Sequence, residues 1–274
     1  MIFDHGCDAI VAVINSTMLM RLFVVGADPY HLFTMMMAIF PFYFVTLEQH
    51  YTGMMNFPPI NGVDEGSIVI SGLAIFSGYY GNVALWQQEI TLPIIGGTYP
   101  LNLVLLRLTQ ASIYPYALQG LYQIYLKRHS EHFKQVYEAK MLFLQIFFYA
   151  FSLFTFTYSQ IISPTEVWRT HQRTVQMAFG GLIMYIVHRL QYSHIIDQKV
   201  NPLRRTVVLT WALIWLNIYW ILSHKQPLIN EGYLFYLLNV LIWGACLHQA
   251  YYLLEEMKTI LKINIFLVKQ KKVE

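Results

Sequence analysis

Long apolar stretches, separated by short segments rich in polar residues, Gly and Pro, dominate the pattern along this chain. The separating segments include "NFPPINGVDEG" at 56–66 and "PIIGGTYP" at 93–100, which break helices and favour turns. A helix needs about 20 mostly apolar residues to cross the core of a bilayer. The pattern therefore predicts an all-α, polytopic integral membrane protein with about eight transmembrane helices, at about 8–25, 31–49, 66–86, 100–126, 140–162, 173–191, 206–223 and 232–256.

Composition supports this interpretation, because 56% of the 274 residues are hydrophobic and only 12% are charged. The segments between the predicted spans are too short for a soluble domain, so we expect residues 1–274 to form a single integral membrane domain. Cys7 and Cys246 are the only cysteines, which excludes a disulfide framework. The sequence contains no H-E-x-x-H, P-loop, G-x-G-x-x-G or G-x-S-x-G motif, so these soluble-enzyme templates do not apply.

Basic residues are distributed unequally between the two ends of the predicted helices. If eight helices alternate in direction, one end collects thirteen of the 18 basic residues: Lys127, Arg128, Lys134, Lys140, Arg189, Lys199, Arg204, Arg205, Lys258, Lys262, Lys269, Lys271 and Lys272. The opposite end has Arg21, Arg169, Arg173 and Lys225. The positive-inside rule then places the first end, with a basic tail at 257–274, in the cytosol. This asymmetry explains the net charge of +3, and we expect no nucleic-acid partner.

Two carboxylates, Asp4 and Asp8, stand at the cytosolic start of the first apolar run, within "FDHGCD" at residues 3–8. Side chains four residues apart on a helix share one face, with Cβ atoms about 5–6 Å apart, close enough to bind one divalent cation. The alternative is that both acids simply interact with the partial positive charge of a helix N-terminus. Spacing alone favours this second reading.

Other polar residues are predicted at the same end of the bundle. Glu48, His50 and Glu65 flank the loop "LEQHYTGMMNFPPINGVDEG", and His188 and His194 lie near the end of the sixth span. Ionisable groups at the ends of spans often reach the lipid headgroups without any further role. Because these residues share the side of Asp4 and Asp8, they are also candidates for a functional site.

Several segments together resemble the CDP-alcohol phosphotransferase family. "FDHGCD" looks like the second half of its signature, D-G-x-x-A-R, eight residues, then G-x-x-x-D-x-x-x-D, in the form found in eukaryotic ethanolamine and choline phosphotransferases. Further segments are similar to family segments in the same order: "FPFYFVTLEQHYTG" at 40–53 with "PPINGVDEG" at 58–66, and "FGGLIMYIVHRLQYSH" at 179–194. "VYEA" at 136–139 and "INIFLVKQKK" at 263–272 are similar as well. The resemblance covers essentially the whole chain.

The chain also departs from the family pattern. Family members usually have ten membrane helices, and the half-motif D-G-x-x-A-R lies on the helix before the one that begins here. That half-motif does not occur in this sequence, and Leu47 replaces the family's Trp before Glu48. The resemblance therefore leads us to expect an N-terminal truncation by two helices.

The resemblance implies transfer of phosphoethanolamine or phosphocholine from CDP-ethanolamine or CDP-choline to diacylglycerol, which yields phosphatidylethanolamine or phosphatidylcholine and CMP. It also implies Mg²⁺ or Mn²⁺ as the cofactor and a cytosol-facing site in the endoplasmic reticulum or Golgi membrane. By the same resemblance Asp4 is a metal ligand, and Asp8 is a metal ligand or general base. His5, next to the metal, is a further catalytic candidate. The candidates for substrate contact are Glu48, His50 and Glu65.

Two alternatives of other classes stay open at this point. A truncated relative can be inactive and instead bind lipid or pair with a full-length enzyme. A small transporter is the second alternative. It would have charged residues near the middle of several spans, and Arg107 is the clearest such residue here. The choice between ethanolamine and choline, and whether the protein forms a homodimer, are also left open.

Overall fold

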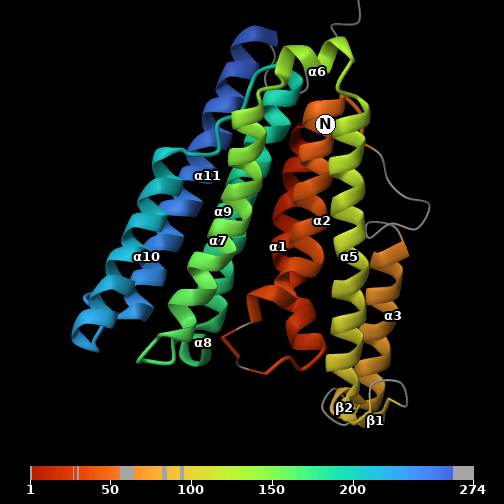
Figure 1. Ribbon diagram of the computed structural model, residues 1–274, viewed down its shortest axis with the longest axis vertical. Coiled ribbons are helices and arrows are strands. Elements are labelled where there is room, and N and C mark those ends of the chain that lie inside the picture. The colour runs from red at the N-terminus through yellow and green to blue at the C-terminus, as the bar shows by residue number, and fades with distance from the viewer. Residues whose placement is uncertain are drawn as a thin grey trace, which may run out of the picture.

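The computed structural model describes residues 2–26, 28–29, 31–55, 65–81, 85–92 and 96–261, and this part of the chain is mostly α-helical. Long helices run roughly side by side and form a bundle (Figure 1). They are α1 (Ile2–Leu22), α2 (His31–Thr52), α3 (Glu65–Tyr80), α5 (Leu101–Leu126), α7 (Ala139–Ile161), α9 (Gln172–Ile195), α10 (Arg205–His224) and α11 (Glu231–Leu261). Two short helices, α6 (Glu131–Val136) and α8 (Val167–Thr170), lie in connections.

Each predicted span coincides with one of these long helices, so the apolar pattern located the helices correctly. Among the described residues, three helical stretches are long and apolar enough to cross a membrane, namely Ala139–Ile161, Arg205–His224 and Glu231–Glu256. An all-α membrane protein therefore fits the structure. The number of eight crossings stays a prediction.

The third predicted span is too long at its C-terminal end. Helix α3 ends at Tyr80, and Gly81 follows with a positive φ of 84° that favours glycine. The chain then buries Trp86, whose indole Nε1 donates a 2.8 Å hydrogen bond to Ser77 Oγ. Next comes a small antiparallel hairpin of β1 (Glu89–Thr91) and β2 (Thr98–Pro100), in which Ile90 faces Tyr99. Helix α3 therefore ends six residues before the predicted end of this span at residue 86.

Helix α9 is the centre of the bundle, and α1, α2, α7 and α11 all pack against it. Two adjacent glycines permit the closest of these contacts. A Cβ on Gly180 would lie 2.6 Å from Val13 Cγ1 of α1, and one on Gly181 would lie 3.0 Å from Trp243 Nε1 of α11. The Gly-Gly pair therefore lets α9 fit between α1 and α11.

Polar side chains that are buried or half-buried join neighbouring helices. Asn239 Nδ2 and Trp243 Nε1 of α11 donate to the backbone carbonyl oxygens of Thr174 and Met177 on α9, at 2.8 and 3.3 Å. Trp211 Nε1 of α10 donates to Ser152 Oγ of α7 at 3.1 Å. Such bonds are expected within a membrane bundle, because a polar group without a partner there costs free energy.

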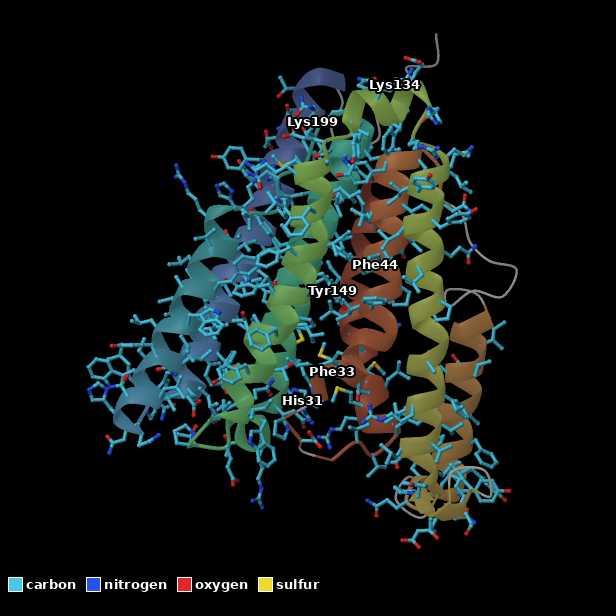
Figure 2. All side chains as sticks on the ribbon, in the orientation of Figure 1. His31, Phe33, Phe44, Lys134, Tyr149 and Lys199 are labelled. Carbon is cyan, nitrogen blue, oxygen red and sulfur yellow. The ribbon has the colours of Figure 1, made fainter. Side chains whose placement is uncertain are left out.

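The basic residues gather at one end of the bundle, as predicted. This end, at the top of Figure 1, holds the start of α1, the end of α2, α6 and the end of α9. Figure 2 shows Lys134 and Lys199 at this basic end, whereas His31 lies at the opposite end. On α6 the Lys134 ammonium, 2.7 Å from Glu131 Oε1, lowers the pKa of Glu131. The tail at 262–274 lies outside the described residues, and the assignment of the basic end to the cytosol stays a prediction.

Candidate functional site

The "FDHGCD" segment lies in the first two turns of α1, at the basic end of the bundle. Positions 4 and 8 belong to one continuous helix and are therefore about one turn apart on the same face. The side chain of Asp8 is exposed. The side chains of Asp4 and His5 lie outside the described residues.

The position of Asp8 along α1 weakens the alternative in which it only interacts with the helix N-terminus. Helix α1 is already formed at Ile2, so Asp8 lies beyond its first turn. The favourable effect of the helix dipole on a carboxylate is confined to that first turn. The structure thus leaves Asp8 as an exposed carboxylate without an obvious helix-capping role.

His188 of α9 holds the same turn of α1. Its imidazole Nε2 donates a 3.0 Å hydrogen bond to the backbone carbonyl oxygen of Gly6, across 182 residues of sequence. Gly6 lies between Asp4 and Asp8 in the sequence. From the sequence alone His188 was more simply an interfacial histidine, and nothing in its spacing could predict this contact.

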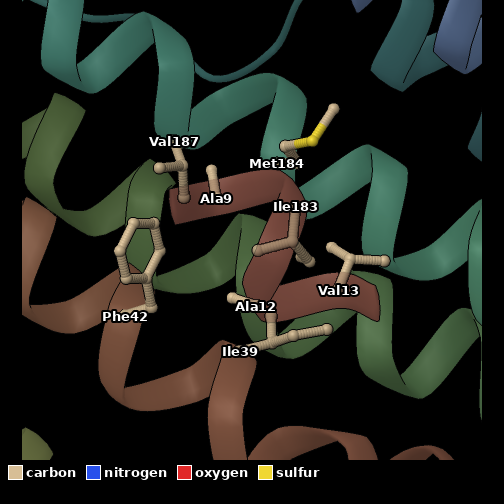
Figure 3. A pocket seen from close by; sticks show the side chains of 8 residues that line it. All are labelled: Ala9, Ala12, Val13, Ile39, Phe42, Ile183, Met184 and Val187. Atoms are coloured by element: carbon tan, nitrogen blue, oxygen red, sulfur yellow. The ribbon is translucent and has the colours of Figure 1, made fainter. Parts of the chain in front are cut away.

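Toward the middle of the bundle, α1 presents an apolar face. Figure 3 shows a small cavity of about 10 Å³ among side chains of α1, α2 and α9. Its lining residues are Ala9, Ala12, Val13, Ile39, Phe42, Ile183, Met184 and Val187. This volume is only about that of one water-sized sphere, and the lining offers no polar partner for a water. Polar chemistry at this end is therefore expected around Asp8 and not in the cavity.

Glu48 lies near the end of α2 and is only 4% exposed. It packs against the backbone of α5, where a Cβ on Gly120 would lie 3.3 Å from Glu48 Oε2. The glycine therefore leaves room for the carboxylate between the two helices. The sequence predicted Glu48 at this end of the bundle but not its burial against α5.

His50 lies in a group of three histidines, His50, His132 and His194, which we call the histidine cluster. His132 Nε2 on α6 donates to the His50 carbonyl oxygen at 3.1 Å, and His132 Nδ1 lies 3.3 Å from Asp197 Oδ1. The rings of His132 and His194 meet edge to face with centroids 5.8 Å apart. The His50 ring is fully buried, and neither of its nitrogens has a hydrogen-bond partner among the described residues. Sequence reasoning missed His132.

Glu48 and His50, two of the three predicted substrate residues, share an end with Asp8 but lie at a different depth. Ala9, next to Asp8, lines the same cavity as Phe42 of α2. Glu48 and His50 lie six and eight residues beyond Phe42, which is roughly 9 and 12 Å further along a helix axis at 1.5 Å per residue. Glu65 is the first residue of α3, and its side chain lies outside the described residues.

The structure does not show a complete metal site. Within the part of the chain that it describes, no group of three His, Cys, Asp or Glu side chains is placed to hold a metal ion. The side chains of Asp4, His5 and Glu65 lie outside the described part of the chain. The metal assignment therefore stays a prediction that rests on Asp8 and on the helical spacing of positions 4 and 8.

Fold and site together describe an all-α membrane protein with an exposed carboxylate on a tightly packed helix at the basic end. No family model matches the chain. It is similar to "Uncharacterized CDP-alcohol phosphatidyltransferase class-I family protein 3" of Dictyostelium discoideum, with 26% identity over 216 residues, which cover 73% of this chain and 54% of the relative. It is also similar to "Choline/ethanolaminephosphotransferase 2" of Arabidopsis thaliana, with 24% identity over 285 residues, 98% of this chain and 70% of the relative.

A third relative, "Choline/ethanolaminephosphotransferase 1" of Arabidopsis thaliana, is 24% identical over 224 residues, 77% of this chain and 56% of the relative. The chain thus spans little more than half the length of two of these three relatives. At 24–26% identity, these relatives support a relationship to the CDP-alcohol phosphatidyltransferase family.

Proposed function

We propose that this chain carries part of the active site of a CDP-alcohol phosphotransferase that makes phosphatidylethanolamine or phosphatidylcholine. The observation that carries this proposal is the exposed Asp8 within "FDHGCD", on a helix whose opposite face packs into an apolar bundle. The named relatives in Arabidopsis, which are choline/ethanolaminephosphotransferases, support the same head-group chemistry.

In the proposed reaction, the 3-hydroxyl oxygen of diacylglycerol attacks the phosphorus that bears ethanolamine or choline. A new P–O bond to the glycerol forms, and the P–O bond to CMP breaks, so that CMP leaves with the bonding electrons. The hydroxyl proton passes to Asp8, acting as general base. An exposed carboxylate near the lipid headgroups is suitable for this role, because it can meet a lipid hydroxyl and a water-soluble nucleotide at the same boundary.

Mg²⁺ or Mn²⁺ fits the chemistry of these donors, since both ions prefer carboxylate oxygens. Asp4 and Asp8 are the residues that would hold it, with His5 beside them. When bound, the ion would neutralise negative charge on the pyrophosphate of the CDP-alcohol.

Glu48, His50 and Glu65 are proposed to contact the substrates from the ends of α2 and α3. Because Glu48 is covered by α5 and His50 by α6, such contacts require these helices to move away from the end of α2. The basic residues around this end would face the cytosol, and anionic lipid or nucleotide would be attracted to them. The membrane is proposed to be that of the endoplasmic reticulum or the Golgi apparatus.

The placement of buried ionisable residues favours an enzyme over a transporter. Among the described residues, the buried acidic and histidine side chains are His31, Glu48, His50 and Glu231. His31 and Glu231 are the first residues of their helices, and Glu48 and His50 lie close to the end of α2. A transport path would require such groups near the middle of the membrane.

The test is a transfer assay on a chimaera in which two helices that carry the D-G-x-x-A-R half-motif precede residue 1. Membranes from cells without their own activity would receive labelled CDP-ethanolamine or CDP-choline, diacylglycerol and Mg²⁺. We expect labelled phospholipid and CMP from the chimaera, and no turnover from the 274-residue polypeptide alone. Absence of product from a chimaera that is folded in the membrane would contradict the proposal, and robust turnover by the polypeptide alone would contradict the need for a second half-motif.

A further inference from the structure

We propose that His188 is a positioning residue, which holds the Gly6 carbonyl and so fixes the turn of α1 that carries Asp8. The proposal rests on the proposed function for the meaning of Asp8, but its structural part stands on contacts within the described residues. It assigns a role to a side chain that belongs neither to α1 nor to the predicted substrate residues.

A hydrogen bond joins His188 of α9 to the backbone of α1 at Gly6. In an α-helix the Gly6 carbonyl oxygen accepts from the amide of residue 10, and its second lone pair is free for another donor. His188 Nε2, at 3.0 Å, supplies that donor from a different helix. The bond therefore ties the backbone of α1 to α9 without replacing any bond within α1.

This bond is part of the α1–α9 interface. Val13 and Gly180 form a close apolar contact further along the same interface, where a Cβ on Gly180 would lie 2.6 Å from Val13 Cγ1. The Gly6–His188 bond lies about two turns nearer to the basic end of both helices. Two separated contacts fix both the spacing and the rotation of α1 against α9.

Asp8 lies two residues after Gly6 and points away from the bundle, since its side chain is exposed while its neighbour Ala9 is buried. Catalytic groups lose much of their effect when they are displaced by as little as about 1 Å, so an anchor at this position is useful.

Hydrogen–deuterium exchange on the 274-residue chain in lipid nanodiscs tests the anchor without requiring activity. His188→Leu should accelerate exchange in peptides from residues 2–12 by roughly fivefold, the factor expected for one lost hydrogen bond. Exchange in α7, α10 and α11 should not change. His188→Gln, which keeps a side-chain N–H donor, should restore most of the protection. His248→Leu is the matched control, because His248 is exposed on α11, where its ring is tilted against that of Tyr252.

Addition of Mn²⁺ separates this proposal from the proposed function. If Asp8 binds the cation, Mn²⁺ should further protect residues 2–12 in the unaltered chain and in His188→Gln, and protect them less in His188→Leu. Faster exchange at residues 2–12 in His188→Leu, with no Mn²⁺ effect in any variant, would support the role of the Gly6–His188 hydrogen bond and contradict cation binding at Asp8. Unchanged exchange at residues 2–12, or an equal increase across all helices, would overturn the anchor whether or not Mn²⁺ binds.

Discussion

Replacing Gly180 by alanine tests whether α9 holds α1 as closely as the structure indicates. The new Cβ would lie 2.6 Å from Val13 Cγ1 and 3.1 Å from Val13 Cγ2. Real Cβ atoms do not approach carbon atoms this closely, so one of the helices must shift. Val13 is β-branched and 2% exposed, and its stiff side chain cannot simply rotate away.

The magnitude follows from two opposing effects. Alanine in place of glycine within a helix is favourable by about 0.5–1 kcal/mol, because it restricts the unfolded chain. Overpacking of a well-filled contact costs about 1–3 kcal/mol. We therefore expect Gly180→Ala to lower the free energy of unfolding by about 1 kcal/mol, the difference between the middles of these two ranges.

Gly244→Ala on α11 is the matched control, since its new Cβ would meet nothing within 4 Å. It should be neutral or stabilising by up to about 1 kcal/mol. Unfolding of both variants by denaturant titration in detergent micelles measures the difference. The double variant with Val13→Ala and Gly180→Ala should be more stable than the sum of the two single effects predicts. The expected coupling free energy is about 1 kcal/mol or more. If Gly180→Ala is as stable as Gly244→Ala, the close α1–α9 contact is wrong.

Two further predictions concern other parts of the bundle. Gln145 is fully buried, accepts a hydrogen bond from Tyr51 Oη at 2.9 Å and donates one to the Val200 carbonyl oxygen at 3.1 Å. Gln145→Leu leaves both partners unpaired and should lower the free energy of unfolding by about 2 kcal/mol or more. Thermal unfolding measures this against the exposed control Gln198→Leu, and equal stability of the two variants would refute it. Tags before Met1 and after Glu274 should both be cleaved by protease outside sealed microsomes, because both ends are predicted at the basic, cytosolic end; protection of one tag alone would contradict an even number of crossings.

The positions of the helices could be predicted because bilayer-length apolar runs report directly on local structure. The gathering of basic residues at one end followed from the same pattern together with alternating directions. The third span shows the limit of this reasoning. The apolar pattern continues to residue 86, whereas α3 ends at Tyr80, where Gly81 has a positive φ. Trp86 donates a hydrogen bond to Ser77 and meets the ring of Phe23 edge to face. Those contacts depend on how α1 and α3 pack, which the apolar pattern does not contain.

The candidate site was predictable only in part, for a similar reason. "FDHGCD" identified the helix and the helical spacing of Asp4 and Asp8, and the structure adds that Asp8 is exposed. His188, Gly180 and Gly120 act through contacts with residues 72 or more positions away, and short-range periodicity carries no signal for them. His132 was missed because a histidine in a connection has no distinguishing pattern until α6 is seen to cover the end of α2.

The central claim is that Asp8 belongs to the chemistry, and Asp8→Asn in the chimaera tests it most directly. The amide keeps the size of the side chain but removes the charge that a cation or a proton requires. Formation of labelled CMP from CDP-ethanolamine or CDP-choline would be measured across a range of Mg²⁺ concentrations, with Glu255→Gln as control, an acid on α11 that pairs with Lys258. We predict that Asp8→Asn lowers turnover at least about 10²-fold at every Mg²⁺ concentration, while Glu255→Gln has little effect. Near-normal turnover by a folded Asp8→Asn chimaera would contradict the account.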